Sequence, residues 1–119
     1  MKLIVLAFIA VMAVSGIASA NATYPNSMST LLLKSDCELP DRPSQIRCET
    51  FLVGVVDTIN ALSVSGDLEK SYLCIPEGVT EVQLRKVFVD YIAAQDSVDL
   101  SASAASHVIR AFGETFPCK

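Results

Sequence analysis

The 119-residue sequence has no tryptophan and only one histidine, His107. Without tryptophan it lacks the broadest aromatic platform on which a ligand could stack. A lone histidine gives no imidazole pair at metal-binding spacing, and the four cysteines contain no C-x-x-C pair, so zinc is not expected. No phosphate loop or dinucleotide-binding glycine pattern is present. We therefore predict no metal and no cofactor.

Basic residues are also few and form no cluster. Nine Lys and Arg stand against 13 Asp and Glu, which gives a formal net charge of -4. An acidic chain of this kind is a poor candidate for binding nucleic acid or an anionic membrane surface. A basic protein partner would complement the charge, although solubility alone explains it equally well.

The sequence contains no residue pattern typical of an enzyme. His107 lies in a predicted helix near Ser103 and Ser106, but such serines lack the strained turn and oxyanion donors that a catalytic nucleophile needs. Asp96 and Asp99 lie in a loop, and their spacing does not mark them as a general acid and base. We predict a protein without catalytic residues.

The first 20 residues, MKLIVLAFIAVMAVSGIASA, have the order of a secretory signal peptide: a lysine, an apolar run and small residues at the end. A permanent membrane anchor is the alternative, but the apolar run is shorter than the roughly 20 residues that span a bilayer. Cleavage after Ala20 would leave residues 21–119 as one small exported domain without a membrane segment.

The four cysteines, Cys37, Cys48, Cys74 and Cys118, all lie in this mature part. An even number of cysteines in a small exported chain predicts two disulfides. A domain of this size has a marginal core, and each bridge can add about 2–4 kcal/mol to its stability. The cysteines are therefore expected to be structural.

Apolar residues recur at helical spacing in four segments, residues 25–35, 43–66, 80–95 and 100–116. The β-branched residues of the second segment make a strand the alternative there, but its apolar run is too long and too periodic for one. Four amphipathic helices with short corners and no strand pair predict an all-α fold. We expect a small disulfide-stapled bundle of about four helices after the cleaved signal peptide.

The third segment has the clearest start. Pro76 and Gly78 suit the second and fourth positions of a type I turn. Thr80 as N-cap and Gln83 three residues later form a capping box. These four residues are expected to be structural and to set where the helix begins.

The expected helix order favours one disulfide pairing. A short loop makes the third and fourth helices antiparallel neighbours, which brings Cys118 toward Cys74. Cys37 and Cys48 bracket the corner between the first two helices. The pairs Cys37–Cys48 and Cys74–Cys118 are therefore favoured over the other two connectivities.

The loop between the third and fourth segments, residues 95–101, is a candidate partner-binding surface. It places Asp96, Ser97 and Asp99 at the tip of a helical hairpin. The alternative is a solvated loop that only caps the helices. Both interpretations fit the sequence.

Three blocks of sequence resemble one known family: CETFLVGVVD, CIPEGVTEVQLRKVFVDYI and ASHVIRAFGETFPC. Together they are similar to the Rap/Tai group of type VI secretion immunity proteins. The matching positions are Cys48, Gly54, Asp57, Cys74, Ile75, Pro76, Gly78, Val79, Thr80, Gln83, Leu84, Phe116, Pro117 and Cys118. Thr50 departs from the family, which often has glycine or a small residue there.

The resemblance implies that residues 21–119 form a Rap/Tai-like immunity domain, all-helical, periplasmic and often a homodimer. Its partner would be a cognate peptidoglycan amidase effector injected by sister cells, and a rigid element would fill or cover the amidase cleft. Two other functions suit the same scaffold. One is a small periplasmic chaperone of the acid-stress type, and the other is an orphan interaction domain whose effector has been lost.

Overall fold

The computed structural model of the protein describes residues 28–68 and 72–119. In these two ranges it contains four helices and no β-strand beyond one isolated bridge. The helices are α1 (Thr30–Glu38), α2 (Arg42–Ser65), α3 (Glu81–Ala93) and α4 (Ala104–Thr115). The expected small all-α bundle with two disulfides is confirmed. The predicted signal peptide, residues 1–20, lies outside the described residues. The first helix begins at Thr30 and not near Pro25 as predicted, because Met28 and Ser29 are not helical and Ser29 is the N-cap.

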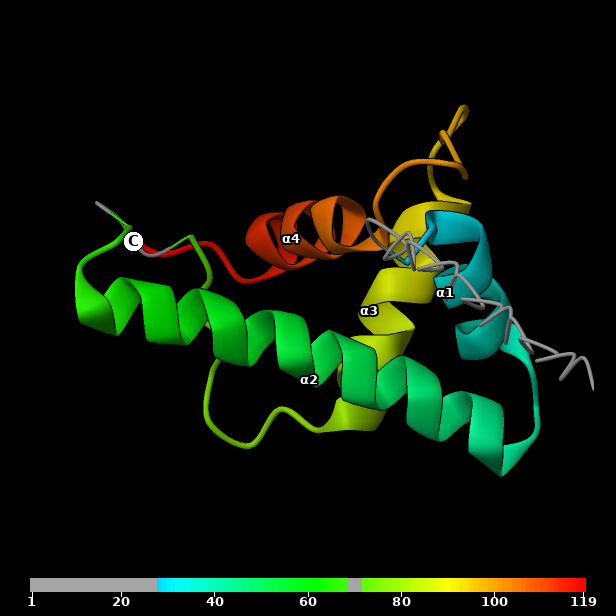
Figure 1. Ribbon diagram of the computed structural model, residues 1–119, viewed down its shortest axis with the longest axis horizontal. Helices are drawn as coiled ribbons and strands as arrows, with labels where there is room; N and C mark the ends of the chain where they lie inside the picture. Colours follow the sequence, from blue (N-terminus) through cyan, green and yellow to red (C-terminus); the bar gives the residue numbers. More distant parts are fainter. Residues whose placement is uncertain (1–27, 69–71) are drawn as a thin grey trace, which may run out of the picture.

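α2 is the longest helix and runs along one side of the bundle, and α3 crosses behind it (Figure 1). Each of the four helices contacts the other three. Apolar side chains with no exposed surface come from every helix, and the largest are Leu33, Leu52, Phe88, Val108 and Phe112. Because one core serves all four helices, the loops at their ends have defined positions relative to one another.

α1 ends later than the sequence predicted. Its N-cap is Ser29, whose hydroxyl oxygen accepts a hydrogen bond from the Leu32 N–H at 3.3 Å. The helix continues to Glu38 instead of stopping near Ser35. The first residue after Ser35 that opposes helical geometry is Pro40, so the sequence offers no earlier stop.

α4 begins later than predicted, at Ala104 instead of Leu100. The carbonyl of Leu100 accepts a hydrogen bond from the Leu31 N–H at 2.9 Å. The carbonyl of Ala102 accepts one from the Thr30 N–H, also at 2.9 Å. These bonds to the start of α1 replace the helical bonds that the two carbonyls would otherwise make, which keeps this segment outside the helix.

The start of α3 has the predicted capping box, but the turn before it lies one residue later than expected. The Thr80 hydroxyl accepts from the Gln83 N–H at 3.3 Å, and Oε1 of Gln83 accepts from the Thr80 N–H at 2.8 Å. The Val79 N–H donates to the Pro76 carbonyl at 3.4 Å, so Pro76 is the first residue of the turn and Gly78 the third. Gly78 has a φ of 86°, which a type II turn requires at its third position. The type I prediction was therefore wrong.

Two disulfides join Cys37 to Cys48 and Cys74 to Cys118, with Cα–Cα distances of 5.1 and 5.0 Å. They are the two pairs that the sequence favoured. The first bridge is buried between α1 and α2, whereas Cys74 of the second is exposed. The Cys74 N–H also donates to the Phe116 carbonyl at 3.0 Å. The chain leading into α3 is thus joined to the chain leaving α4.

Candidate partner-binding surface

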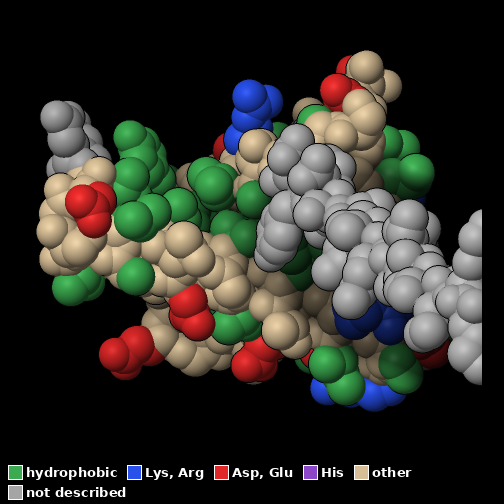
Figure 2. All heavy atoms as spheres, in the orientation of Figure 1, with side chains coloured by type: hydrophobic (Ala, Val, Ile, Leu, Met, Phe, Trp, Pro, Cys, Tyr) green, Lys and Arg blue, Asp and Glu red, His purple; other side chains and the backbone are tan. Residues whose placement is uncertain are grey.

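The loop between α3 and α4, residues 95–101, projects from the bundle (Figure 1). Asp96, Ser97 and Asp99 are all exposed, and acidic side chains lie at the projecting end of the molecule (Figure 2). The structure therefore places these three candidate residues on one prominent surface.

Asp99 is engaged within the loop itself. Its Oδ1 accepts hydrogen bonds from the Ser101 N–H at 2.9 Å and from the Ser101 hydroxyl at 2.6 Å. Its carbonyl accepts from the Ala102 N–H at 3.1 Å. The pKa of the Asp99 carboxyl is lowered, first by the Ser101 hydroxyl bond and then by the backbone bond, with a smaller effect of His107. Asp99 therefore shapes the loop.

Asp96 and Ser97 differ from Asp99 in this respect. Within residues 28–68 and 72–119, neither side chain makes a hydrogen bond or an ion pair. Their polar groups are directed to solvent at the end of a loop whose shape Asp99 helps to define. They are thus the better placed of the three candidates for contact with another molecule.

The far side of the loop is anchored to the start of α1. The Ala104 N–H donates to the Met28 carbonyl at 2.8 Å, and Ser29 forms an antiparallel bridge with Ser103. Together with the bonds that Thr30 and Leu31 donate to Ala102 and Leu100, these contacts join residues 28–31 to residues 100–104. Sequence reasoning missed them because the partners are about 70 residues apart in the chain and no local pattern marks them.

His107 is half-buried and its Nδ1 lies 2.9 Å from Oγ1 of Thr30. The hydrogen bond that positions its ring is therefore directed to α1 and away from Ser103 and Ser106. His107 is therefore packed against α1. Among the described residues no group of three or more His, Cys, Asp or Glu side chains is arranged to hold a metal ion.

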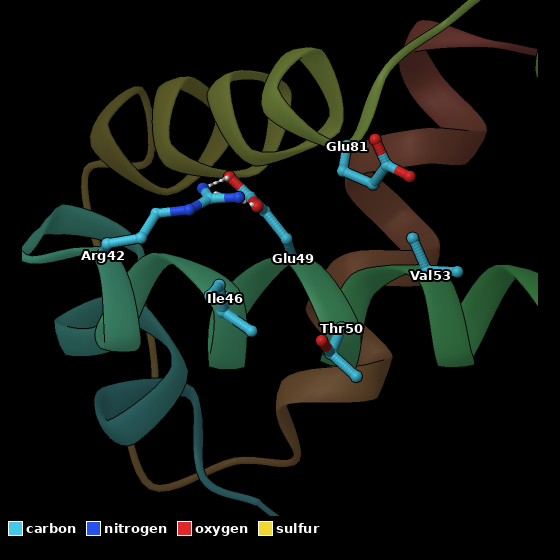
Figure 3. A pocket seen from close by; sticks show the side chains of 6 residues that line it. All are labelled: Arg42, Ile46, Glu49, Thr50, Val53 and Glu81. Atoms are coloured by element: carbon cyan, nitrogen blue, oxygen red, sulfur yellow. Dashed lines mark hydrogen bonds and ion pairs between the residues drawn. The ribbon is translucent and has the colours of Figure 1, made fainter.

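A hollow of about 400 Å³ lies between α2 and the start of α3, and Figure 3 shows the six side chains that line it. Glu49 is almost fully buried there, with Arg42 Nη1 at 3.1 Å and Arg85 Nε at 3.5 Å from its carboxylate. Glu81 lines the other end, and Thr50, the residue that departs from the family pattern, lies between. Because Glu49 is paired with two arginines, the hollow is best described as a structural ion-pair site.

A second hollow, of about 350 Å³, is almost entirely apolar and lies between α2 and α4. Hydrophobic side chains gather on the face where these two helices run beside each other (Figure 2). Gly54 is exposed on this side, and a Cβ atom there would meet nothing within 4 Å. Among the residues that the structure describes, no close helix contact therefore requires this glycine.

α2 is also the one helix of the described part that is long and apolar enough to span a membrane. Its most apolar window has a mean hydropathy of 1.2, and 17% of that window is buried. Core helices of other proteins meet the same criterion, and Leu52 and Ile59 of α2 lie in the core here. Length and composition alone do not make α2 a membrane span.

Residues 29–118 match the family model of the Rap1a immunity proteins. The matched range contains all four helices and all four cysteines. Comparison with curated proteins and with solved structures finds no match.

Proposed function

Because the chain belongs to the family of Rap1a immunity proteins, we propose that it binds a type VI secreted peptidoglycan amidase and blocks it. The match over residues 29–118 is the observation that carries this proposal. A protein of this kind protects the cell that makes it from the effector of a sister cell. It acts by binding, so it needs a recognition surface and no catalytic group.

The mechanism we propose is occlusion of the amidase cleft by residues 95–101. Asp96 and Ser97 present their polar groups at the end of this loop, and Asp99 supports its shape. Ordering a free residue costs about 1–2 kcal/mol of backbone entropy. A loop that is already held by hydrogen bonds avoids much of that loss on binding, so more of the contact energy appears as affinity.

The proposed site of action is the periplasm. Residues 1–20 have the pattern of a cleavable export signal, and disulfides persist in oxidising compartments such as the periplasm. The bridges Cys37–Cys48 and Cys74–Cys118 suit that environment. A peptidoglycan amidase delivered between cells would meet its substrate in the same compartment.

If an exported amidase is encoded beside the gene for this protein, co-purification with that amidase tests this function. The oxidised mature protein should form a stable complex with that amidase and abolish its release of peptide from purified cell walls. An unrelated amidase with the same fold class serves as the control and should stay active. If the folded protein forms no complex and hydrolysis continues, the immunity proposal is wrong. Suppression of protein aggregation at low pH would then favour a chaperone.

A further inference from the structure

Thr30 and His107 lie on different helices and meet at the base of the α3–α4 loop. Thr30, at the start of α1, has no exposed surface. Its Oγ1 lies 2.9 Å from Nδ1 of His107 in α4 and 3.0 Å from the carbonyl oxygen of Ala102. Its N–H donates to the same Ala102 carbonyl at 2.9 Å. One buried residue thus connects α1, α4 and the end of the loop.

The proton positions in this group follow from its geometry. A threonine hydroxyl has one hydrogen, and the Ala102 carbonyl can only accept. If Oγ1 donated to His107, it would face the Ala102 oxygen at 3.0 Å without a hydrogen between them. The arrangement that leaves no such contact has Oγ1 donating to Ala102 and accepting from His107. Nδ1 of His107 must then carry a hydrogen.

We propose that Thr30 and His107 are positioning residues that hold the partner-binding loop in its binding conformation. This inference rests on the proposed function and on the assignment of residues 95–101 as the contact surface. His107 Nδ1–H donates to Thr30, and Thr30 donates twice to Ala102. The pair acts through the loop and makes no contact with the partner itself.

The contacts continue from Ala102 toward the tip of the loop. The Ala102 N–H donates to the Asp99 carbonyl at 3.1 Å, and Ser101 donates twice to the Asp99 carboxylate. The chain of bonds therefore runs from His107 through Thr30 and Ala102 to Asp99. A shift at Ala102 changes the backbone that carries Asp96 and Ser97.

Two substitutions remove the hydrogen bond between Thr30 and His107, and two conservative substitutions keep it. Thr30→Val keeps the size and the buried methyl group but loses the hydroxyl, and His107→Leu loses the donor. Thr30→Ser keeps the hydroxyl, and the amide of His107→Asn can place an N–H near the position of Nδ1. Thr115→Val is the matched control because it removes a hydroxyl that donates to the Ala111 carbonyl of its own helix at 2.8 Å.

Inhibition of the cognate amidase is the first readout. His107→Leu loses one buried hydrogen bond and Thr30→Val loses two, so each should weaken inhibition at least about tenfold, which corresponds to about 1.4 kcal/mol. Thr115→Val, Thr30→Ser and His107→Asn should stay within about threefold of the unchanged protein. Unchanged inhibition by folded Thr30→Val and His107→Leu would overturn the proposal, whereas an unchanged protein that binds no amidase would instead overturn the proposed function.

Two further measurements need no amidase. The ¹⁵N shifts of neutral His107 should show the Nδ1–H tautomer, and the amides of residues 99–102 should exchange faster in His107→Leu than in Thr115→Val. The Nε2–H tautomer, or equal exchange in the two variants, would contradict the proposed positioning role. Because His107 is half-buried and Thr30 fully buried, His107→Leu keeps the test available if Thr30→Val does not fold.

Discussion

Cys74 and Cys118 are bonded across a sequence separation of 44 residues, and the Cys74 N–H reinforces the link by donating to Phe116. The disulfide closes residues 74–118, which include α3 and α4, into one covalent ring. Since the loop that carries Asp96 and Ser97 lies at the other end of these two helices, the bridge limits how far the helix pair can splay.

We predict that the two disulfides differ in their resistance to reductant. Cys74 is exposed, whereas Cys37 and Cys48 are 4% and 0% exposed. Thiol–disulfide exchange requires access to a sulfur atom. Mild reduction followed by alkylation and peptide mass spectrometry should therefore label Cys74 and Cys118 first. Earlier labelling of Cys37 and Cys48 would contradict the packing described for α1 and α2.

Loss of the Cys74–Cys118 bridge should also lower stability. The entropy of closing a loop of this length predicts a loss of about 4 kcal/mol on replacing both cysteines by serine. Urea denaturation, monitored by the helical circular dichroism signal, measures the difference. A loss below about 1 kcal/mol would show that the bridge adds little to the bundle.

The capping box of α3 gives a second stability prediction. Thr80→Ala removes the acceptor for the Gln83 N–H and should lower the free energy of unfolding by about 1 kcal/mol. Glu77→Ala, at an exposed position of the preceding turn, is the control and should change stability by less than about 0.5 kcal/mol. Equal effects of the two substitutions would show that the capping box does not stabilise α3.

The Glu49 ion pairs give a third prediction. Glu49→Ala leaves Arg85, whose side chain is 20% exposed, without its ion-pair partner. It also leaves the space of the buried Glu49 side chain unfilled. Arg42 is 63% exposed and can be solvated, so the expected loss is about 2 kcal/mol, below that of a fully buried pair. Thermal denaturation of Glu49→Ala and Glu81→Ala compares the paired carboxylate with the exposed one. Similar midpoints would mean that Glu49 is not structurally important.

The lowered pKa values of two carboxyl groups predict how the free energy of unfolding depends on pH. The pKa of Asp41 is lowered, first by the backbone bond from Ser44, and the pKa of Asp99 is lowered by its bonds from Ser101. A carboxyl group whose pKa is lower in the folded than in the unfolded state favours folding above its unfolded pKa. This contribution is lost as the pH falls through the folded pKa.

The stability of the protein should therefore fall as the pH drops below about 4, close to the unperturbed aspartate pKa of 3.8. Asp41→Asn and Asp99→Asn each remove one of the titrating groups, so both variants should show a shallower loss between pH 4 and pH 2. Urea midpoints measured at several pH values test this. Slopes equal to that of the unchanged protein would contradict the assigned role of Ser44 and Ser101 as hydrogen-bond donors.

The sequence predicted those features that depend on neighbours in the chain. The α3 capping box needs only Thr80 and Gln83, three residues apart, and its hydrogen bonds formed as expected. The disulfide pairing followed from the order of the helices. Both features arise from short-range patterns or from a topology that short loops impose.

The start of α4 and the partner of His107 could not be predicted in this way. Both depend on Thr30, whose contacts with Ala102 and His107 span 72 and 77 residues. A helix-forming pattern at Leu100 is overridden there because its carbonyl bonds to α1. Tertiary hydrogen bonds of this kind leave no periodic signal in the sequence.

Titration of the amidase with this protein tests the central claim most directly. Peptide release from cell walls should stop at about one equivalent of the unchanged protein. Asp96→Arg should weaken inhibition at least about tenfold, because it reverses the charge of an exposed side chain at the loop tip. Glu114→Arg changes the same charge near the other end of α4, roughly 15 Å along the helix from its start, and should inhibit normally. Continued hydrolysis with excess unchanged protein would contradict the immunity function, and full inhibition by Asp96→Arg would contradict the assignment of the loop.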